Sequence, residues 1–337
     1  MPTRPRALVL MGSDTFSALF DEERLDRLAS LAHLGDLTAL ADLDDTAHDP
    51  ELAEVEVLIT SWGAPALDAR LLARLPRLRA VFHAAGSIRA HVTEAFWERG
   101  ILITSAADVN AVPVAEFTLA AILLAGKRAL VHVRTPGAPR LPDEGLGRHA
   151  KLGNHGRTIG VVGFSRTGRR VVDLLRPFDG LDVVVADPFA DRRAVEAAGA
   201  RLAPLAEVLP VSDVLTLHAP ALPSTRHLIG PAQLAALPDG ATLINTARGA
   251  LVDHDALLRE CRSGRLDAIL DVTDPEPLPA DSELFRLPNV AVTPHLAGSL
   301  GTETRRLVDA ALDELEAYSA GRPAAHPVDR AELARSA

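Results

Sequence analysis

One segment, TIGVVGFSRTGRRV (residues 158–171), constrains the fold of this chain more than any other. An apolar run typical of a buried strand leads into glycines and then into the start of a helix. Gly163 would permit a tight turn, and Gly168 would permit close packing of the helix, whose free N-terminal amides can hold a pyrophosphate. The next apolar run ends in Asp187, 24 positions after Gly163, near the roughly 20 expected of a carboxylate that binds a ribose diol. This order predicts a dinucleotide-binding βαβ unit of the Rossmann type.

Two details bear on which dinucleotide such a unit binds. Ser165 replaces the middle glycine of the usual pattern, where the backbone approaches the phosphates, and its small side chain is tolerable there. Asp187 favours NAD over NADP, because a carboxylate repels a 2′-phosphate. Arg192 and Arg193 follow closely and keep NADP open as the alternative.

The whole chain alternates short apolar runs with amphipathic stretches, which implies parallel sheets with helices on both faces. In the first hundred residues we expect strands at 7–11, 55–60, 79–84 and 101–104, and helices at 17–31, 66–75 and 93–99. A second series predicts strands at 158–163, 182–187, 213–218, 241–246, 267–272 and 290–293, and six is the number in a complete dinucleotide-binding sheet. We also expect a long apolar helix at 112–130, a Gly- and Pro-rich loop at 135–156 and a helix at 303–320. The predicted fold class is α/β, with two doubly wound parallel sheets.

Composition excludes several classes of protein. The 337 residues are 47% hydrophobic and 24% charged, which is typical of a globular protein rather than a disordered one. The formal net charge of −10 argues against nucleic acid as a partner. The single cysteine, Cys261, can form neither an internal disulfide nor a thiolate zinc site, so we expect no metal and a cytoplasmic location. The apolar stretch 114–126 contains Glu116 and is shorter than the ~20 residues that a membrane helix needs, so we expect no membrane segment.

Side chains suited to anion binding and proton transfer follow the last three predicted strands. These are Arg248 in LINTARGALVD, Asp271 and Glu276 in AILDVTDPEPLP, and His295 in VAVTPHLAGS. The carboxyl ends of parallel strands form the edge of the sheet where ligands bind. A guanidinium matches a carboxylate with two parallel hydrogen bonds, and a carboxylate beside an imidazole fixes which ring nitrogen carries the proton. The spacing therefore predicts an acid–base site at this edge.

These motifs together resemble the signature of the D-isomer-specific 2-hydroxyacid dehydrogenase family. The resemblance rests on GFSRTG, NTARGALVD, DVTDPEP and TPHLAG in this order, on HAAGSI (residues 83–88), and on ERGILITSAADVNAVPVAEFTLAAIL (residues 98–123). It covers nearly the whole chain. It implies a Rossmann cofactor domain at 108–299, inserted into a flavodoxin-like substrate domain formed by 1–107 and 300–337, and a homodimer through the helix at 112–130.

The resemblance also implies a reaction and a role for each matching residue. NAD would exchange a hydride with a small 2-hydroxy acid or its 2-oxo acid. His295 would act as general acid–base, Glu276 would hydrogen-bond to it, and Arg248 would hold the substrate carboxylate and 2-oxygen. The backbone amides of Gly86 and Ser87 would also bind that carboxylate. The positions assigned to the cofactor are Gly163, Ser165, Arg166, Thr167, Gly168, Asp187, His218, Ala219, Pro220, Thr225, Thr246, Ala247, Asp271 and Gly298, with Asp271 on the nicotinamide carboxamide.

The substrate stays open because the loop after Gly86 reads SIRAHVTEAF, which departs from the family pattern. Arg89 or His91 would add positive charge, so one alternative is a phosphonate or phosphite oxidoreductase. Another is an NADH-sensing binding protein similar to the family's transcriptional corepressors. Trp62, in TSWGAP, is expected either to form a wall of the substrate pocket or to lie in the core.

Overall fold

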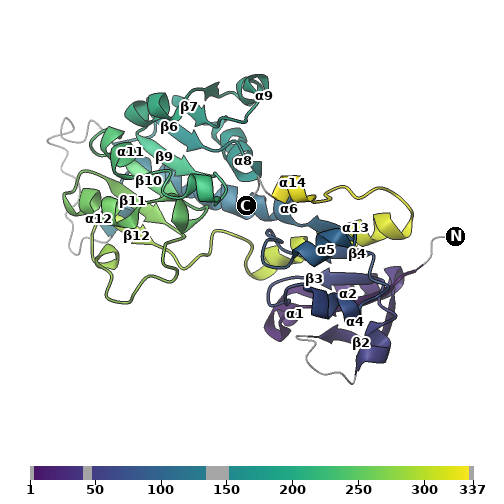
Figure 1. Cartoon of the computed structure of the whole chain (residues 1–337). Helices are drawn as coiled ribbons and strands as arrows, with labels where there is room; N and C mark the ends of the chain where they lie inside the picture. The colour runs from purple at the N-terminus through teal and green to yellow at the C-terminus, as the bar shows by residue number, and fades with distance from the viewer. Residues whose placement is uncertain (1–3, 41–47, 134–151, 334–337) are drawn as a thin grey trace. The chain divides into compact units, whose positions relative to one another are not determined.

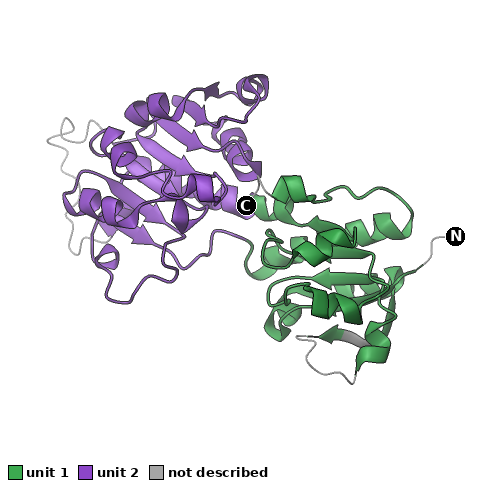
Figure 2. Cartoon of the chain, in the orientation of Figure 1, with its two compact units in different colours: residues 1–111, 299–335, 337 green, residues 112–298, 336 purple. Residues whose placement is uncertain are grey.

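The computed structural model describes residues 4–40, 48–133 and 152–333, and the chain divides into two compact units (Figure 2). Unit 1 comprises the chain up to Ala111 and again from Ser299, and unit 2 comprises Val112–Gly298. Unit 2 is therefore inserted into unit 1. Most of the loop expected at 135–156 lies outside the described residues.

Unit 1 is built on a five-stranded parallel sheet in the order β2-β1-β3-β4-β5, the order of flavodoxin-like folds. Figure 1 labels β2, β3 and β4 of this sheet. Its strands are β1 (Arg6–Leu10), β2 (His33–Leu40), β3 (Val57–Thr60), β4 (Ala80–His83) and β5 (Leu102–Ser105). Successive side chains of a strand point to opposite faces, and each face of this sheet has its own apolar core. One core holds α1 (Ser13–Leu19), α2 (Glu22–Leu31) and α13 (Thr304–Ser319). The other holds α3 (Asp49–Leu52), α4 (Ala69–Arg74), α5 (Glu94–Glu98) and the end of α14 (Arg330–Leu333).

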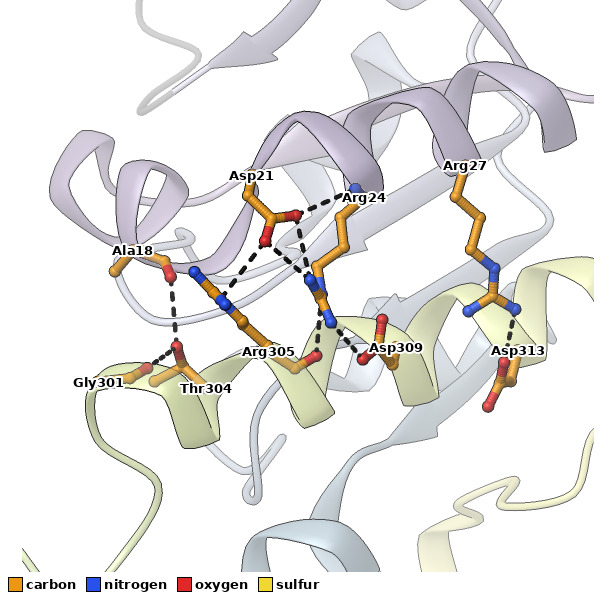
Figure 3. A network of polar contacts seen from close by, with 9 residues as sticks. All are labelled: Ala18, Asp21, Arg24, Arg27, Gly301, Thr304, Arg305, Asp309 and Asp313. Carbon is orange, nitrogen blue, oxygen red and sulfur yellow. Dashed lines mark hydrogen bonds and ion pairs between the residues drawn. The ribbon is translucent and has the colours of Figure 1, made fainter.

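The C-terminal helix α13 is tied to α2 by ion pairs, as Figure 3 shows. Arg24 of α2 has a side chain that is only 12% exposed. Its Nη1 donates to Asp21 at 2.9 Å, and its Nη2 donates to Asp309 of α13 at 2.7 Å. One turn further along, Arg27 donates to Asp313 at 2.6 Å. The helix α13 therefore lies in the same layer as α1 and α2, on one face of the unit 1 sheet.

Unit 2 is built on a seven-stranded parallel sheet in the order β12-β11-β10-β9-β6-β7-β8. Its strands are β6 (Arg157–Val162), β7 (Leu181–Ala186), β8 (Arg201–Leu202), β9 (Val214–Leu217), β10 (Thr242–Asn245), β11 (Asp267–Leu270) and β12 (Val290–Val292). Counted from β6, the first six follow the Rossmann order 3-2-1-4-5-6. One apolar core holds α10 (Leu205–Val208), α11 (Pro231–Ala236) and α12 (His254–Arg262). The other holds α6 (Ala107–Gly126), α8 (Arg166–Leu175), α9 (Arg192–Ala197) and the start of α7 (Ala129–Val133). The prediction of two parallel-sheet α/β domains is confirmed.

Three local predictions were wrong. Two strands were not predicted: β2, whose pattern is interrupted by Gly35, and β8, which is only two residues long. The two sheets therefore have five and seven strands instead of four and six. The helix expected at 17–31 is two helices, because α1 ends at Leu19 and the side chain of Asp21 caps the start of α2.

The long apolar helix also begins earlier than expected. α6 has 20 residues, Ala107–Gly126, so the argument that it is too short to cross a membrane was wrong. By length and apolar composition alone it passes as a membrane-spanning helix. Ala115, Ile122 and Ala125 of this helix are buried in the core of unit 2. Less than half of its apolar window is buried, and Leu124 is exposed.

Candidate active site

The loop between β6 and α8 has the geometry of a phosphate-binding turn. Gly163 has a φ of +97°, a left-handed conformation that favours glycine. A Cβ on Gly168 would lie 2.0 Å from the carbonyl oxygen of Gly163, so the helix can pack this closely only with glycine there. Ser165 caps α8, because its Oγ accepts a hydrogen bond from the amide of Gly168 at 3.3 Å. Arg166 and Thr167 form the first turn of this helix, where the helix dipole favours an anion.

Asp187 follows β7 and lies beside this loop. Its Oδ2 accepts from the amide of Phe164 at 2.7 Å, and its Oδ1 accepts from that of Phe189 at 2.8 Å. The carboxylate also lines a cavity of about 520 Å³, together with Arg192 and with apolar side chains such as Val162 and Leu228. A mainly apolar cleft of this size with one carboxylate fits the adenine and ribose of a dinucleotide, and Arg192 keeps the NADP alternative open.

The segment after β9 closes the other side of the phosphate loop. The amide of Ala219 lies 2.7 Å from the point that a Cβ on Gly163 would occupy. His218 is buried, its Nε2 contacts Thr216 Oγ1 at 3.0 Å, and burial lowers the pKa of His218 to about 3. This imidazole is therefore neutral and cannot offer a charge to a phosphate.

Thr225 is bonded within its own turn. Its hydroxyl donates to the carbonyl of Pro220 at 2.6 Å and accepts from the amide of Leu222 at 2.8 Å. These contacts shape the turn after Pro220, and binding of the cofactor by Thr225 stays a prediction.

Arg248 lies just beyond β10, on a turn that Asn245 holds. The side chain of Asn245 is fully buried, accepts from the amide of Ala247 at 3.0 Å and donates to the carbonyl of Arg248 at 2.9 Å. The guanidinium of Arg248 is half-buried and donates to the carbonyl of Ala247 at 2.6 Å. A Cβ on Gly249 would lie 2.0 Å from the backbone carbon and oxygen of Thr273, so this turn packs directly on the loop after β11.

Asp271, at the end of β11, holds the loop that carries His295. Its carboxylate is buried, with the residue 2% exposed. Oδ1 accepts from Thr293 Oγ1 at 2.5 Å and from the amide of Leu296 at 2.8 Å, and Oδ2 accepts from the amide of Ala297 at 3.0 Å. Two carboxylate oxygens can accept about four hydrogen bonds, so one site remains on Oδ2 for a ligand amide.

Glu276 and His295 are in direct contact, through Oε1 of the carboxylate and Nδ1 of the ring. Both side chains are half-exposed. His295 has a φ of +53°, which is uncommon for a residue other than glycine, and its amide donates to the carbonyl of Asp271 at 3.0 Å. With Nδ1 engaged by the carboxylate, Nε2 is the ring nitrogen available for proton exchange. The Arg248 turn contacts the same loop at Thr273, three residues before Glu276.

Thr246 is buried, and its hydroxyl is linked through the hydroxyl of Thr118 to a backbone carbonyl of α6. Thr118 Oγ1 donates to the carbonyl of Val114 at 2.7 Å and lies 2.8 Å from Thr246 Oγ1. Since a threonine hydroxyl has one proton, Thr246 is the donor in this pair. Ala247 and Gly298, the other neighbours expected of the cofactor at this edge, are half-buried.

Gly86 and Ser87 belong to unit 1, where they follow β4 and are half-buried. A Cβ on Gly86 would lie 3.0 Å from Nδ2 of Asn110, whose Oδ1 accepts from the amide of Ser299 at 3.1 Å. Asn110, Asn245 and Thr293 were not among the predicted site residues. Each is a short polar side chain inside a motif that the sequence does show, and only the hydrogen bonds reveal its role.

Among the residues that the structure describes, no group of three or more His, Cys, Asp or Glu side chains could hold a metal ion. The lone cysteine, Cys261, is buried in α12, and burial raises the pKa of its thiol to about 12.

The sequence of this chain is similar to those of known dehydrogenases. Residues 143–297 fit the family described as "D-isomer specific 2-hydroxyacid dehydrogenase, NAD binding domain". The glyoxylate reductase of Aeropyrum pernix is 32% identical over 276 residues, which are 78% of this chain and 80% of that protein. The (S)-sulfolactate dehydrogenase of Chromohalobacter salexigens is 34% identical over 290 residues, which are 81% of this chain and 92% of that protein.

Two further comparisons bear on length and fold. The D-3-phosphoglycerate dehydrogenase of Methanocaldococcus jannaschii is 29% identical, and this chain spans only 52% of its length. The crystal structure of the TT0316 protein from Thermus thermophilus superposes with a TM-score of 0.75 and 30% identity, over 96% of this chain and all of that one. The chain therefore belongs to the D-isomer specific 2-hydroxyacid dehydrogenase family, and unit 2 carries that family's NAD-binding domain.

Proposed function

We propose that this protein interconverts a small 2-hydroxy acid and its 2-oxo acid with NAD(H), with His295 as the general acid–base. The observation that carries the proposal is the contact between Glu276 and His295 at the carboxyl edge of the unit 2 sheet. The names of its relatives, a glyoxylate reductase among them, support a substrate of this size. The family's NAD-binding domain and the carboxylate of Asp187 in the cavity support NAD as the coenzyme, while Arg192 in the same lining is the feature that would favour NADP.

When bound, the coenzyme supplies the hydride as NADH or accepts it as NAD. In the direction of reduction, Arg248 binds the carboxylate of the 2-oxo acid and orients its carbonyl. His295 delivers a proton from Nε2 to the carbonyl oxygen, while Glu276 holds the ring by its other nitrogen. In the direction of oxidation, the neutral ring takes up the hydroxyl proton. Asp271 offers its remaining acceptor site to the nicotinamide carboxamide. Binding of the substrate carboxylate by the amides of Gly86 and Ser87 of unit 1 stays a prediction.

The phosphonate alternative is weakened at His91 but not at Arg89 in the loop after Gly86. Burial lowers the pKa of His91, which favours its neutral ring. Arg89 donates to the carbonyl of Leu333 in α14 at 2.5 Å, and a bond to a neutral carbonyl does not cancel the charge of a guanidinium. The corepressor-like alternative is disfavoured by the named activities of the relatives. A homodimer and a cytoplasmic location remain proposals, and sedimentation of the purified chain measures the first.

A substrate panel tests the proposed function. NADH oxidation should be seen with at least one of glyoxylate, hydroxypyruvate, pyruvate and phenylpyruvate, and NADPH should be used much less well because Asp187 repels its phosphate. Phosphite with NAD should give no reduction of the coenzyme. If none of the 2-oxo acids is turned over while NADH still binds, the enzymatic proposal is wrong and a sensor role takes its place.

Thr293 is expected to position His295. Thr293→Val keeps the shape but leaves Oδ1 of the buried Asp271 without its shortest hydrogen bond. We expect kcat to fall by about 10-fold, because misplacement of an acid–base group slows the chemical step, while the Kd for NADH stays unchanged. Thr293→Ser restores the hydroxyl and should recover most of kcat. An equal loss in the serine variant would show that the methyl packing, not the hydrogen bond, matters.

A further inference from the structure

Two histidine rings lie against each other inside unit 1. His83, at the end of β4, is 1% exposed, and His91 lies in the loop before α5, with its ring centroid 4.6 Å from that of His83. Nδ1 of His83 lies 2.8 Å from the hydroxyl oxygen of Thr60, at the end of β3. Nε2 of His83 and Nδ1 of His91 are buried and lack a well-formed hydrogen bond among the described residues. The pair therefore suits two neutral rings, because a charged imidazole donates from both nitrogens and would leave a buried donor unpaired.

Segment 84–91, which joins the two rings, is fixed at its ends and packed in its middle. Backbone hydrogen bonds hold the ends: the amide of Ala84 donates to the carbonyl of Thr60 at 2.7 Å, that of Ala106 to Ala85 at 3.0 Å, and that of Leu67 to His91 at 2.8 Å. In the middle, Ile88 is 2% exposed in the core of this face, and the carbonyl of Ser87 faces the ring of His83. The positions of Gly86 and Ser87 therefore depend on this packing and not on a sheet ladder.

Both rings bind a proton less readily in this place than in water. Burial, and then the charge of His91, lower the pKa of His83 to about 3, although the carbonyl of Ser87 opposes the shift. Burial also lowers the pKa of His91, against the carbonyls of Pro65 and Ala64. An exposed imidazole has a pKa of about 6.5. A movement that exposes the rings thus makes them better bases.

The charged side chains on neighbouring segments have partners of their own. Asp68 accepts from the amide of Leu71 at 2.8 Å, Glu94 pairs with Arg330 at 2.7 Å, Asp108 pairs with His326 at 3.2 Å, and Arg89 donates to the carbonyl of Leu333 at 2.5 Å. The turn after β3, whose carbonyls face His91, adds no charge, and its Trp62 is 42% exposed rather than part of the core. The charge that bears on His83 is that of His91, which opposes a second proton on the pair.

We propose that His83 and His91 form an acid-sensitive latch on segment 84–91, which is closed while both rings are neutral and opens as they take up protons. The sign follows from proton linkage. The open segment exposes the rings and binds more protons than the closed one, so the closed state is fully favoured above about pH 6.5 and loses stability as the pH falls below that value. The latch lies within unit 1 and goes beyond the proposed function.

The latch has one consequence for catalysis, and that consequence rests on the proposed function. Gly86 and Ser87 lie in segment 84–91, so their predicted binding of the substrate carboxylate should weaken in acid. The latch itself is measured without substrate or coenzyme.

Hydrogen exchange of the purified full chain tests the latch, because amides of a segment that opens locally exchange in proportion to its opening constant. Exchange rates at pH 7.5 and pH 5 are corrected for the intrinsic dependence of exchange on pH. The opening constant of segment 84–91 should rise roughly 30-fold between these values from His83 alone, and further where His91 also takes up a proton. An opening constant that is the same at both values would overturn the proposal.

Variants without a titratable ring separate the latch from a merely structural role. His83→Asn and His91→Gln keep polar side chains that take up no proton, so each should reduce the rise, and the double variant should abolish it. His254→Gln is the matched control, since burial also lowers the pKa of this histidine but it lies in unit 2, and the rise should be unchanged. If the double variant opens more at both pH values and keeps the full rise, the rings only fill space and the proposal is wrong.

Ring titration by NMR on the wild type needs no variant to fold. The ring signals of His83 and His91 should show no protonation of the closed segment between pH 8 and pH 5.5. Titration of both rings near pH 6.5 without faster exchange of segment 84–91 would show that they are protonated in place, and would overturn the latch. Such a result leaves the dehydrogenase function standing, and absence of turnover with every 2-oxo acid leaves the latch standing.

Discussion

Replacement of His295 by alanine should lower kcat for 2-oxo acid reduction by roughly 100-fold to 10,000-fold, the usual contribution of a positioned general acid. Glu276 contacts Nδ1 of this ring. In the alanine variant no imidazole stands between Glu276 and the substrate to deliver a proton. The Kd for NADH should be unchanged, since His295 is not assigned to the coenzyme. Both quantities are measured on one preparation, kcat from NADH absorbance and Kd from NADH fluorescence.

The backbone of His295 calls for a second variant as control. Its φ of +53° is more easily adopted by asparagine than by alanine. His295→Asn should therefore keep the loop in place and still lose the proton transfer. If His295→Asn retains near-normal kcat, the imidazole is not the acid–base group and the proposed mechanism fails.

Arg248→Ala should lower kcat/KM by roughly 100-fold to 1,000-fold, because a partly buried anion would lose its charged partner. Arg248→Lys restores the charge but not the planar fork, so it should recover only part of this loss. Free guanidinium added to the Arg248→Ala variant should raise its rate, because it can occupy the space of the missing side chain. The same addition should not raise the rate of the Arg248→Lys variant. Asn245 and Gly249 hold the turn in all three proteins, so their thermal stabilities should agree.

An unaltered Michaelis constant in Arg248→Lys would contradict two-pronged binding of the substrate carboxylate. A uniform fall in NADH affinity across the Arg248 variants would instead assign Arg248 to the coenzyme.

The alternation of apolar runs and the glycine loop were sufficient to predict both parallel sheets, because strands buried on both faces have short uninterrupted apolar sequences. The pattern failed at β2, where Gly35 breaks the run, and at β8, where two residues leave no pattern to detect. Both are edge strands, which are paired on one side only. The end of α1 was missed because the cap at Asp21 depends on one hydrogen bond rather than on hydrophobicity.

The residues of the site were easier to predict than the contacts between them. The motifs around Arg248, Glu276 and His295 stood out because each follows a strand, but sequence spacing does not say which hydrogen bonds a carboxylate makes. Asp271 was assigned to the nicotinamide, and the structure adds that it organises the His295 loop with three protein hydrogen bonds. Whether Asp271 also binds the nicotinamide stays a prediction.

The ion pairs between α2 and α13 have a consequence for the order in which the chain acquires its structure during synthesis. Unit 2 is continuous in sequence and can complete its sheet as soon as it has left the ribosome. Unit 1 begins with the first strand, but α1 and α2 cover only part of one face of its sheet, and the rest of that face stays uncovered until residues 304–319 have been translated. We therefore expect the unit whose synthesis begins first to finish folding last, and in the interval Phe82 lacks its contact with Tyr318 of α13.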